Sequence, residues 1–185
     1  MTARGFTLFN TAVGRCGIVW GERGIVGLQL PESSDDKARA RVTRRFPSAA
    51  ESEPPAEARK AINLIVALLE GEPSDLSEIG LDMDRVGDFE QRVYAIARKI
   101  PPGRTLTYGD IATKLGDKLA ARDVGQAMGK NPFPIVVPCH RVVAANGKLG
   151  GFSSNGGVKT KLKLLAIEGT LAGSQLGLFE GAASA

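Results

Sequence analysis

The chain has few metal-binding and redox-active residues: one histidine and two cysteines in 185 residues. A structural zinc site normally uses about four Cys, His or carboxylate ligands, and the adjacent pair Cys139-His140 is not a usual ligand spacing. We therefore expect no metal and no cofactor. Without a cysteine framework, a disulfide between Cys16 and Cys139 is also disfavoured, and both are expected to be free thiols.

Long apolar runs are absent as well. No stretch approaches the roughly 20 apolar residues of a membrane span, and the first residues lack the apolar core and cleavage site of a secretory signal. With 43% apolar residues, the chain has enough to build a core. We expect a soluble globular protein in the cytoplasm that makes no membrane contact.

Positive charge is concentrated in the second half of the chain. Residues 1–87 carry 11 Lys or Arg against 13 Asp or Glu, a net charge of −2, whereas residues 88–185 carry 13 against 7, a net charge of +6. This distribution is typical of a half that meets a polyanion. On charge alone, an ordinary solvated basic surface fits equally well.

The first half, residues 1–84, is predicted to be a small α/β domain. Its β-branched and aromatic segments 5–12, 16–22 and 25–30 indicate an antiparallel three-stranded meander with turns at Gly14-Arg15 and Arg23-Gly24. Two helices follow, over 33–46 with a Ser or Asp N-cap and over 54–73 with Pro55 in its first turn. Residues 73–87 are expected to return as a further strand and then to act as a linker.

The second half, residues 88–170, is predicted to be mainly helical. Asp88 with Gln91 resembles a capping box, and the helix that it opens ends at Pro101. A short helix capped by Thr107 and ended by Gly116, then a second over 119–131, give a helix-turn-helix outline. The pair Asn146-Gly147 predicts a β-hairpin, which would make the arrangement winged. A basic helix over 156–169 and a tail over 171–185 complete an α/β (α+β) fold.

The Cys139-His140 pair offers chemistry, because a cysteine is a strong nucleophile only as a thiolate beside a base or a positive field. Adjacent side chains diverge, so His140 is expected to act on Cys139 through a bridging water rather than directly. Only Glu168 and Glu180 are acidic after His140, and Glu168, at the end of a helix, is the better candidate to orient the imidazole. An inert buried thiol and a core histidine are the alternatives.

The string "PCHRVV", preceded by "NPFPIVV", closely resembles the signature of the O6-alkylguanine-DNA alkyltransferases, or methylated-DNA–protein-cysteine methyltransferases. The resemblance runs from Phe89 to Gly169 and includes "TLTYGDIA", "AARDVGQAMGKNP" and "LLAIEG". It implies a ribonuclease H-like first domain. It also implies irreversible transfer to Cys139 of the alkyl group of O6-alkylguanine and, in some cases, of O4-alkylthymine. It also implies that His140 is the water-linked base, Glu168 its orienting acid, and Asn131 a brace for the active-site turn or simply a helix C-cap.

The resemblance further implies binding to double-stranded DNA through the minor groove, with the alkylated guanine flipped out of the stack. Arg122 resembles the arginine finger that enters the stack, and the alternative is a phosphate contact or a solvated residue. Tyr108 resembles the tyrosine that contacts the guanine and helps to rotate it. The small residues Ala121, Gly125 and Ala127 would let this helix approach DNA closely. A monomer is expected, with clustering on DNA left open.

The pocket for the flipped base is expected to include Pro138, Val142, Phe152, Ser153 and Ser154. One hydroxyl or backbone group there would donate to guanine O6 as negative charge develops. Many relatives read Tyr-Ser-Gly-Gly where this chain reads "FSSNGG", so either Ser153 or Ser154 fits that role. Some relatives also hold zinc in the first domain, but this chain has only Cys16 there and no histidine.

Three rival functions fit less well. A non-enzymatic protein that binds alkylated bases would lack the reactive cysteine, which is present here as Cys139. A winged-helix regulator would carry several base-reading polar side chains, whereas "AARDVGQAMGK" is mostly small and apolar. A cysteine hydrolase usually has its Cys and His far apart in sequence.

Overall fold

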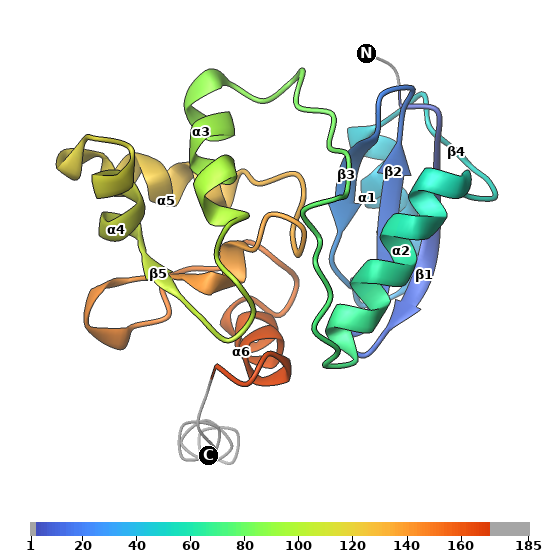
Figure 1. Cartoon of the computed structure of the whole chain (residues 1–185). Coiled ribbons are helices and arrows are strands. Elements are labelled where there is room, and N and C mark those ends of the chain that lie inside the picture. The colour runs from blue at the N-terminus through green and yellow to red at the C-terminus, as the bar shows by residue number, and fades with distance from the viewer. Residues whose placement is uncertain (1–2, 171–185) are drawn as a thin grey trace.

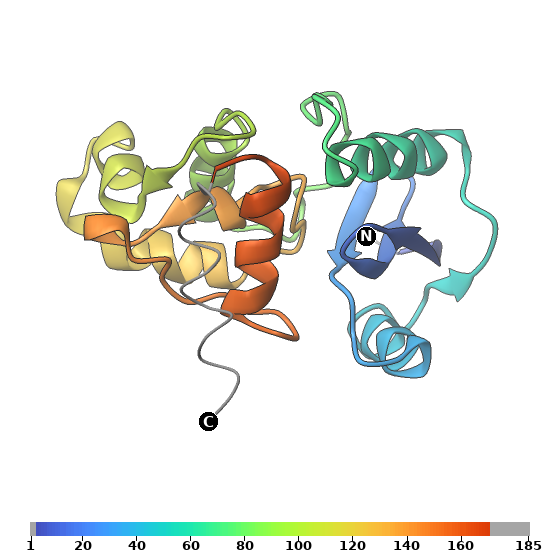
Figure 2. The same cartoon turned by 90° about the horizontal axis from the view of Figure 1, so that it is seen from below.

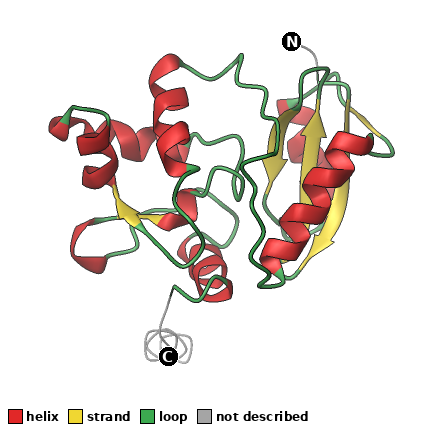
Figure 3. Ribbon diagram, viewed as in Figure 1, coloured by secondary structure: helices red, strands yellow, loops and turns green. Residues whose placement is uncertain are grey.

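The structure is a computed structural model that describes residues 3–170. Two groups of elements lie side by side, the first rich in strands and the second in helices (Figures 1 and 3). The predicted tail, 171–185, lies outside the described residues. No helix in residues 3–170 has the length and apolar character needed to cross a membrane.

The first group is a four-stranded sheet between two helices. Its strands are β1 (Gly5–Thr11), β2 (Gly14–Trp20), β3 (Ile25–Gln29) and β4 (Ala50–Glu51), in the order β3-β2-β1-β4. The meander β1-β2-β3 is antiparallel, as predicted, and β4 adds a short parallel pairing to β1. Helices α1 (Asp35–Arg45) and α2 (Ala56–Leu69) lie on opposite faces of the sheet (Figure 2).

Successive side chains of β2 point to opposite faces of the sheet and pack in different apolar clusters. Ile18 and Trp20 belong to the core that includes α2, whereas Val19 packs in a separate cluster with Val42 of α1. This is the period-two pattern of a strand buried on both sides. Helix α1 begins as predicted, because the hydroxyl of Ser34 accepts a hydrogen bond from the backbone N–H of Lys37 at 3.3 Å.

Two expectations about this group were wrong. The first turn lies at residues 12–13, and Gly14 and Arg15 already belong to β2, where they pair with Thr11 and Asn10. Residues 73–87 do not form a strand; they contribute a single bridge between Leu81 and Ile25. Strand propensity in so short a segment is outweighed by its turn-forming Pro, Asp, Ser and Gly residues.

The second group begins with α3 (Asp88–Ala97). The predicted N-cap at Asp88 was wrong by one residue: Gly87 is the N-cap and Asp88 is the first helical residue. The side-chain amide of Gln91 does not complete a capping box, because it donates to the carbonyls of Val86 at 2.8 Å and Met83 at 3.3 Å. Gln91 thus fixes the preceding segment instead of the helix start.

The predicted helix-turn-helix is formed by α4 (Tyr108–Lys114) and α5 (Ala121–Gly129), joined by the 3₁₀ turn η1 (Lys118–Ala120). Thr107 caps α4 in a reciprocal capping box with Asp110. Gly116, at φ +87°, supplies the left-handed residue that ends α4. Buried residues from both helices pack into the main core, namely Ile111, Ala112, Val124, Ala127 and Met128.

The expected hairpin forms only its turn. Asn146 and Gly147, within η3 (Ala145–Gly147), have φ of 61° and 73°, as a tight turn requires, and the N–H of Ala144 donates to the carbonyl of Lys148 at 2.8 Å. Beyond this one hydrogen bond, the flanking segments form no paired strands with each other within residues 3–170. Instead, β6 (Val142–Val143) pairs in parallel with β5 (Leu106–Thr107), because the next residues turn away toward a glycine-rich loop.

Helix α6 (Val158–Ile167) completes the second group, and the turn η2 (Cys139–Arg141) precedes β6. The two groups share one apolar core. A backbone hydrogen bond also joins them, from the N–H of Leu28 in β3 to the carbonyl of Pro132 at 2.9 Å. An edge strand of the sheet therefore supports the segment that leads to Cys139.

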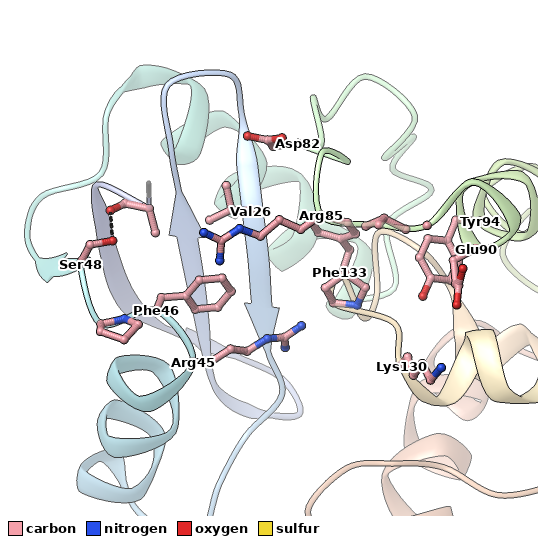
Figure 4. A pocket seen from close by; sticks show the side chains of 15 residues that line it. Val26, Arg45, Phe46, Ser48, Asp82, Arg85, Glu90, Tyr94, Lys130 and Phe133 are labelled. Carbon is pink, nitrogen blue, oxygen red and sulfur yellow. Dashed lines mark hydrogen bonds between the residues drawn. The ribbon is translucent and has the colours of Figure 1, made fainter. Parts of the chain in front are cut away.

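A cavity of about 300 Å³ lies between the two groups (Figure 4). Phe46 and Arg45, at the end of α1, line one side, and Tyr94 and Glu90 of α3 line the other. Its charged residues have both signs, and Cys139 is not part of its wall. Arg45 also borders a second cavity, the one that contains Cys139.

Candidate active site

Cys139 is the first residue of η2 and borders a cavity of about 400 Å³. Both Cys16 and Cys139 are buried free thiols. The cavity wall comes from both groups of elements; besides Cys139 it includes Leu28, Gln29, Leu30, Arg41, Arg45, Tyr108, Gly125, Met128, Gly129, Asn131, Pro134, Gly151, Phe152, Ser153 and Ser154. A nucleophile at a turn, open to a cavity of this size, is accessible to a small planar group.

His140, which follows Cys139 in the chain, meets Glu168, 28 residues further on, and neither residue is part of the cavity wall. The His140 Nε2 atom lies 2.8 Å from Oε1 of Glu168. Arg141 donates two hydrogen bonds to the same carboxylate, of 2.7 and 2.9 Å, and a third to the carbonyl of Ile100 at 2.6 Å. All three side chains are at most 7% exposed, so this network is held in a nearly dry environment.

The charges of this network follow from burial and pairing. Burial tends to raise the pKa of Glu168, but the hydrogen bonds from His140 and Arg141 outweigh it and lower the pKa to about 2. Burial lowers the pKa of His140, and the hydrogen bond to Glu168 opposes this only in part. The site thus holds a carboxylate beside a neutral imidazole at neutral pH.

The remaining ring nitrogen of His140 is available as a base. When Nε2 donates to the Glu168 carboxylate, the neutral ring carries its lone pair on Nδ1. That atom is fully buried and has no hydrogen-bond partner among the described residues. A neutral histidine oriented by a carboxylate, with a free acceptor nitrogen, is the arrangement expected of a general base.

Cys139 itself is not acidified at rest. Burial raises the pKa of its thiol, while a hydrogen bond from Asn131 and the positive charge of Lys161 lower it in part. The thiol therefore needs a base to remove its proton during the reaction.

Asn131 spans the loop that precedes the nucleophile. Its amide N–H donates to the carbonyl of Val137 at 2.8 Å, and its amide oxygen accepts from the N–H of Phe133 at 2.9 Å. Within this loop Ile135 has φ of +76°, a left-handed conformation that costs a β-branched residue on the order of 1–3 kcal/mol. Asn131 thus supports a strained turn that delivers Cys139 to the cavity.

Tyr108 lies between two glycines. The Cβ atom of a side chain built at Gly150 would stand 2.9 Å from the Tyr108 hydroxyl, and one built at Gly125 would stand 3.9 Å from its ring. Burial raises the pKa of Tyr108, and the nearby Cys139 adds to the effect. The ring is therefore a half-buried, neutral donor on the cavity wall, beside Cys139.

The structure does not bring every predicted residue to the site. Ala127, one of the three small residues expected to let this helix approach DNA, is 1% exposed and faces the core, where its carbonyl accepts from the Tyr94 hydroxyl. Pro138 and Val142 are buried and do not appear in the cavity wall, because one precedes the turn and the other enters β6. Arg122 is exposed in the first turn of α5, and Ala121 is half-buried beside it.

The two candidate serines differ in their surroundings. Both Ser153 and Ser154 line the cavity. Ser153 is exposed, whereas the hydroxyl oxygen of Ser154 is buried and has no hydrogen-bond partner among the described residues. An unpartnered buried hydroxyl beside a nucleophile favours Ser154 as the donor to a bound group.

Sequence reasoning missed Lys161. Its side chain is fully buried, and its ammonium group donates to the carbonyls of Val142 at 2.6 Å and Leu149 at 2.5 Å. It also lies 6.0 Å from the ring centre of Phe152. Burial lowers its pKa to about 8, an effect that the nearby Cys139 opposes. Lys161 thus ties the loop at the cavity rim to α6, whereas the sequence predicted only a basic helix over 156–169 and no role for this lysine.

The described residues contain no group of three or more side chains able to hold a metal ion.

Comparisons with known proteins agree with this geometry. Residues 88–170 match the family model described as "6-O-methylguanine DNA methyltransferase, DNA binding domain". A methylated-DNA–protein-cysteine methyltransferase of Methanothermobacter thermautotrophicus is 34% identical over 83% of this chain and 78% of its own length. The protein of the same name from Mycobacterium tuberculosis is 44% identical over 65% of this chain and 70% of its own length.

Solved structures are also similar. The structure of M. tuberculosis OGT in complex with DNA has a TM-score of 0.70 and 33% identity, and the match covers 95% of this chain and 99% of that one. The O6-methylguanine-DNA methyltransferase of Pyrococcus kodakaraensis has a TM-score of 0.69 and 27% identity, covering 89% and 99%. With a paired Cys139 and His140 on this fold, the chain belongs to the methylated-DNA–protein-cysteine methyltransferase family.

Proposed function

We propose that the chain repairs DNA by transferring the alkyl group of O6-alkylguanine to the sulfur of Cys139, once per molecule. The observation that carries this proposal is a buried His140–Glu168 pair whose histidine follows, in the same turn η2, a cysteine that borders a cavity. A cavity with a nucleophile and an oriented base is suited to group transfer. Binding without transfer, the alternative, would leave Cys139 without a role.

In the proposed reaction, a water molecule carries the Cys139 proton to Nδ1 of His140, and Glu168 stabilises the imidazolium that forms. The sulfur attacks the alkyl carbon, so that an S–C bond forms and the O6–C bond breaks. The electron pair of the broken bond stays on the guanine oxygen. Donors on the cavity wall, with Ser154 as the favoured one and Tyr108 as the second, would stabilise that developing charge.

Access to the guanine atom requires the nucleotide to leave the duplex. We propose that α5 binds in the minor groove, where its small residues Ala121 and Gly125 allow close approach and Arg122 enters the stack. The exposure of Arg122 at the start of α5 supports this assignment. One chain holds all the proposed groups, so we propose a monomer as the active unit. A cytoplasmic location is part of the proposal, since the substrate is DNA and both thiols are free.

The proposal also keeps two domains, residues 1–84 and 88–170. The first would support the second through the Leu28–Pro132 hydrogen bond and would supply part of the cavity wall.

The decisive experiment mixes the protein with duplex DNA containing O6-methylguanine and measures its intact mass and the mass of the Cys139 peptide. We expect a gain of one methyl group per molecule on that peptide and no gain in Cys139→Ala. Cys16→Ala is the matched control and should react like the wild type, because burial raises the pKa of Cys16 to about 11 and the cavity does not reach it. Tight binding with no change of mass would refute transfer.

Three further variants test the finer roles. Arg122→Ala should slow transfer from duplex DNA more than transfer from the free alkylated base, since only the duplex requires flipping. Ser154→Ala should slow transfer from both substrates, whereas Ser153→Ala should have little effect. Equal losses for the two serine variants would contradict the choice of Ser154.

A further inference from the structure

Leu119 stands out on the surface of the second group. It is 92% exposed, far more than Val158 at 39%, the other exposed large apolar side chain among the described residues. Single exposed apolar residues are common and mean little by themselves. Two observations nevertheless point to a role for Leu119: the hydrogen bonds that fix its backbone and its place on the surface.

The backbone holds Leu119 in a fixed position. The N–H of Leu119 donates to the side chain of Asp117 at 2.9 Å, and the N–H of Ala120 donates to the Asp117 carbonyl at 3.2 Å. These bonds close the turn η1, which runs directly into α5. The exposure of Leu119 is therefore set by the fold.

Leu119 shares a surface with the proposed DNA-binding residues. Residues 119, 122 and 126 are exposed, whereas 120, 124 and 127 are buried, so Leu119 and Arg122 lie on the outer side of the same helical segment. The exposed Lys114 and Lys118 precede Leu119 in the chain, and the exposed Asp117 and Asp123 lie in the same segment, so residues 114–123 carry a net charge of +1. The α4–α5 junction lies at the end of the molecule away from the N-terminal sheet (Figures 1 and 2).

We infer that Leu119 is a DNA contact, an apolar wedge that enters the minor groove next to Arg122 and packs on the sugars and base edges beside the flipped nucleotide. This inference rests on the proposed function. Minor-groove proteins often combine a cation with an apolar wedge that unstacks a base step. The net positive charge of residues 114–123, with Arg122 three residues after Leu119, suits a polyanion, and one leucine is too small an area for a stable protein interface.

The test compares Leu119→Ala with the wild type on three substrates: duplex DNA with O6-methylguanine, the same strand unpaired, and a free O6-alkylated guanine. We expect transfer from the duplex to slow about tenfold, as for the loss of a partly buried leucine side chain, with little change on the free base. A reporter base next to the lesion should show less unstacking. Leu64→Ala, which shortens a half-buried leucine on α2 away from the proposed DNA-binding surface, is the control for truncation as such and should leave all three rates unchanged.

Salt dependence separates an apolar contact from a charged one. Leu119→Ala should weaken duplex binding without changing the slope of log affinity against log salt, because no counterion is released at this residue. Lys118→Ala, which removes the exposed positive charge next to Leu119 in the chain, should reduce that slope by about 1, as expected for the loss of one phosphate contact. Leu119→Lys should bind undamaged duplex more tightly yet repair slowly, since it adds charge but removes the wedge.

Several outcomes would overturn the inference while leaving the proposed function intact. Wild-type rates for Leu119→Ala on the duplex would do so, as would equal losses on the duplex and the free base, which would indicate a folding defect. A loss seen only on DNA long enough for several molecules would assign Leu119 to contact with a neighbouring copy. Failure of the wild type to transfer would instead refute the proposed function.

Discussion

The hydroxyl of Tyr108 occupies the space that a side chain at residue 150 would need: the Cβ of any residue other than glycine would lie 2.9 Å from it. Gly150 also has φ of +71°, which favours glycine for a second reason. The tyrosine is therefore positioned as much by the absence of a side chain in the rim loop as by its own helix.

Gly150→Ala should displace Tyr108 and slow alkyl transfer by about tenfold or more, since small displacements of a positioning group are costly. Gly147→Ala is the matched control: its φ of +73° imposes the same backbone strain, but nothing lies within 4 Å of the added carbon. Single-turnover rates on lesion-containing duplex check this. Similar rates for the two variants would show that backbone strain, and not the contact with Tyr108, causes the loss.

Glu168→Gln should slow transfer by about 100-fold or more, because the imidazolium that forms at His140 would lose its carboxylate partner. The matched control is Glu180→Gln, the other acid after His140. Rates measured on the free alkylated base would exclude an effect on DNA binding. A rate within twofold of the wild type would remove Glu168 from the mechanism.

The His140–Glu168 pair also predicts how the free energy of unfolding depends on pH. Since the folded-state pKa of Glu168 is lowered to about 2, its contribution is fully present above its unfolded value of about 4.5 and is lost as pH falls toward 2. Denaturant unfolding from pH 7 to 3 should therefore show a steeper loss for the wild type than for Glu168→Gln. Parallel curves would contradict the low pKa.

Lys161→Met should lower the free energy of unfolding by about 1–3 kcal/mol at pH 7, because the buried carbonyls of Val142 and Leu149 lose their donor. In the wild type, the pKa of Lys161 is lowered from 10.5 to about 8, so the unfolded chain binds more protons and stability gains with pH between these values. That gain should vanish in the variant. Lys159→Met, an exposed neighbour on α6, is the control.

Asn131→Ala should destabilise the fold by about 1–3 kcal/mol, since the carbonyl of Val137 and the N–H of Phe133 lose their partner. It should also raise the pKa of Cys139, because the hydrogen bond from Asn131 favours the thiolate. The rate of thiol alkylation against pH measures this shift. An unchanged titration with lowered stability would limit Asn131 to a structural role.

Sequence patterns predicted the local structure where the stabilising hydrogen bonds join residues close together in the sequence. The caps at Ser34 and Thr107 and the meander β1–β3 follow from propensity and turn residues, and these predictions were confirmed. The pairing of β6 with β5 was missed, because two-residue strands carry no periodicity. Lys161 was missed for a related reason: a lysine on a helix is normally solvated, and only the tertiary fold supplies two carbonyls to hold it.

In the candidate site, too, some residues could be predicted from the sequence and others could not. Cys139, His140 and Glu168 could be selected from rarity and chemistry, but the burial of Ala127 could not be predicted, because a small residue on a helix gives no sign of which side faces the core. Arg141 was passed over as part of a motif, although it supplies two of the bonds to Glu168. Contacts between segments far apart in sequence need coordinates to be seen.

The hydrogen bond between Leu28 and Pro132 limits how this protein can be shortened. A fragment containing only residues 88–170 would keep Cys139, His140 and Glu168, yet it would lose the strand edge that holds the nucleophile loop and the wall formed by Leu28, Leu30 and Arg41. The smallest unit that an engineer could use as a self-labelling tag therefore includes the N-terminal sheet.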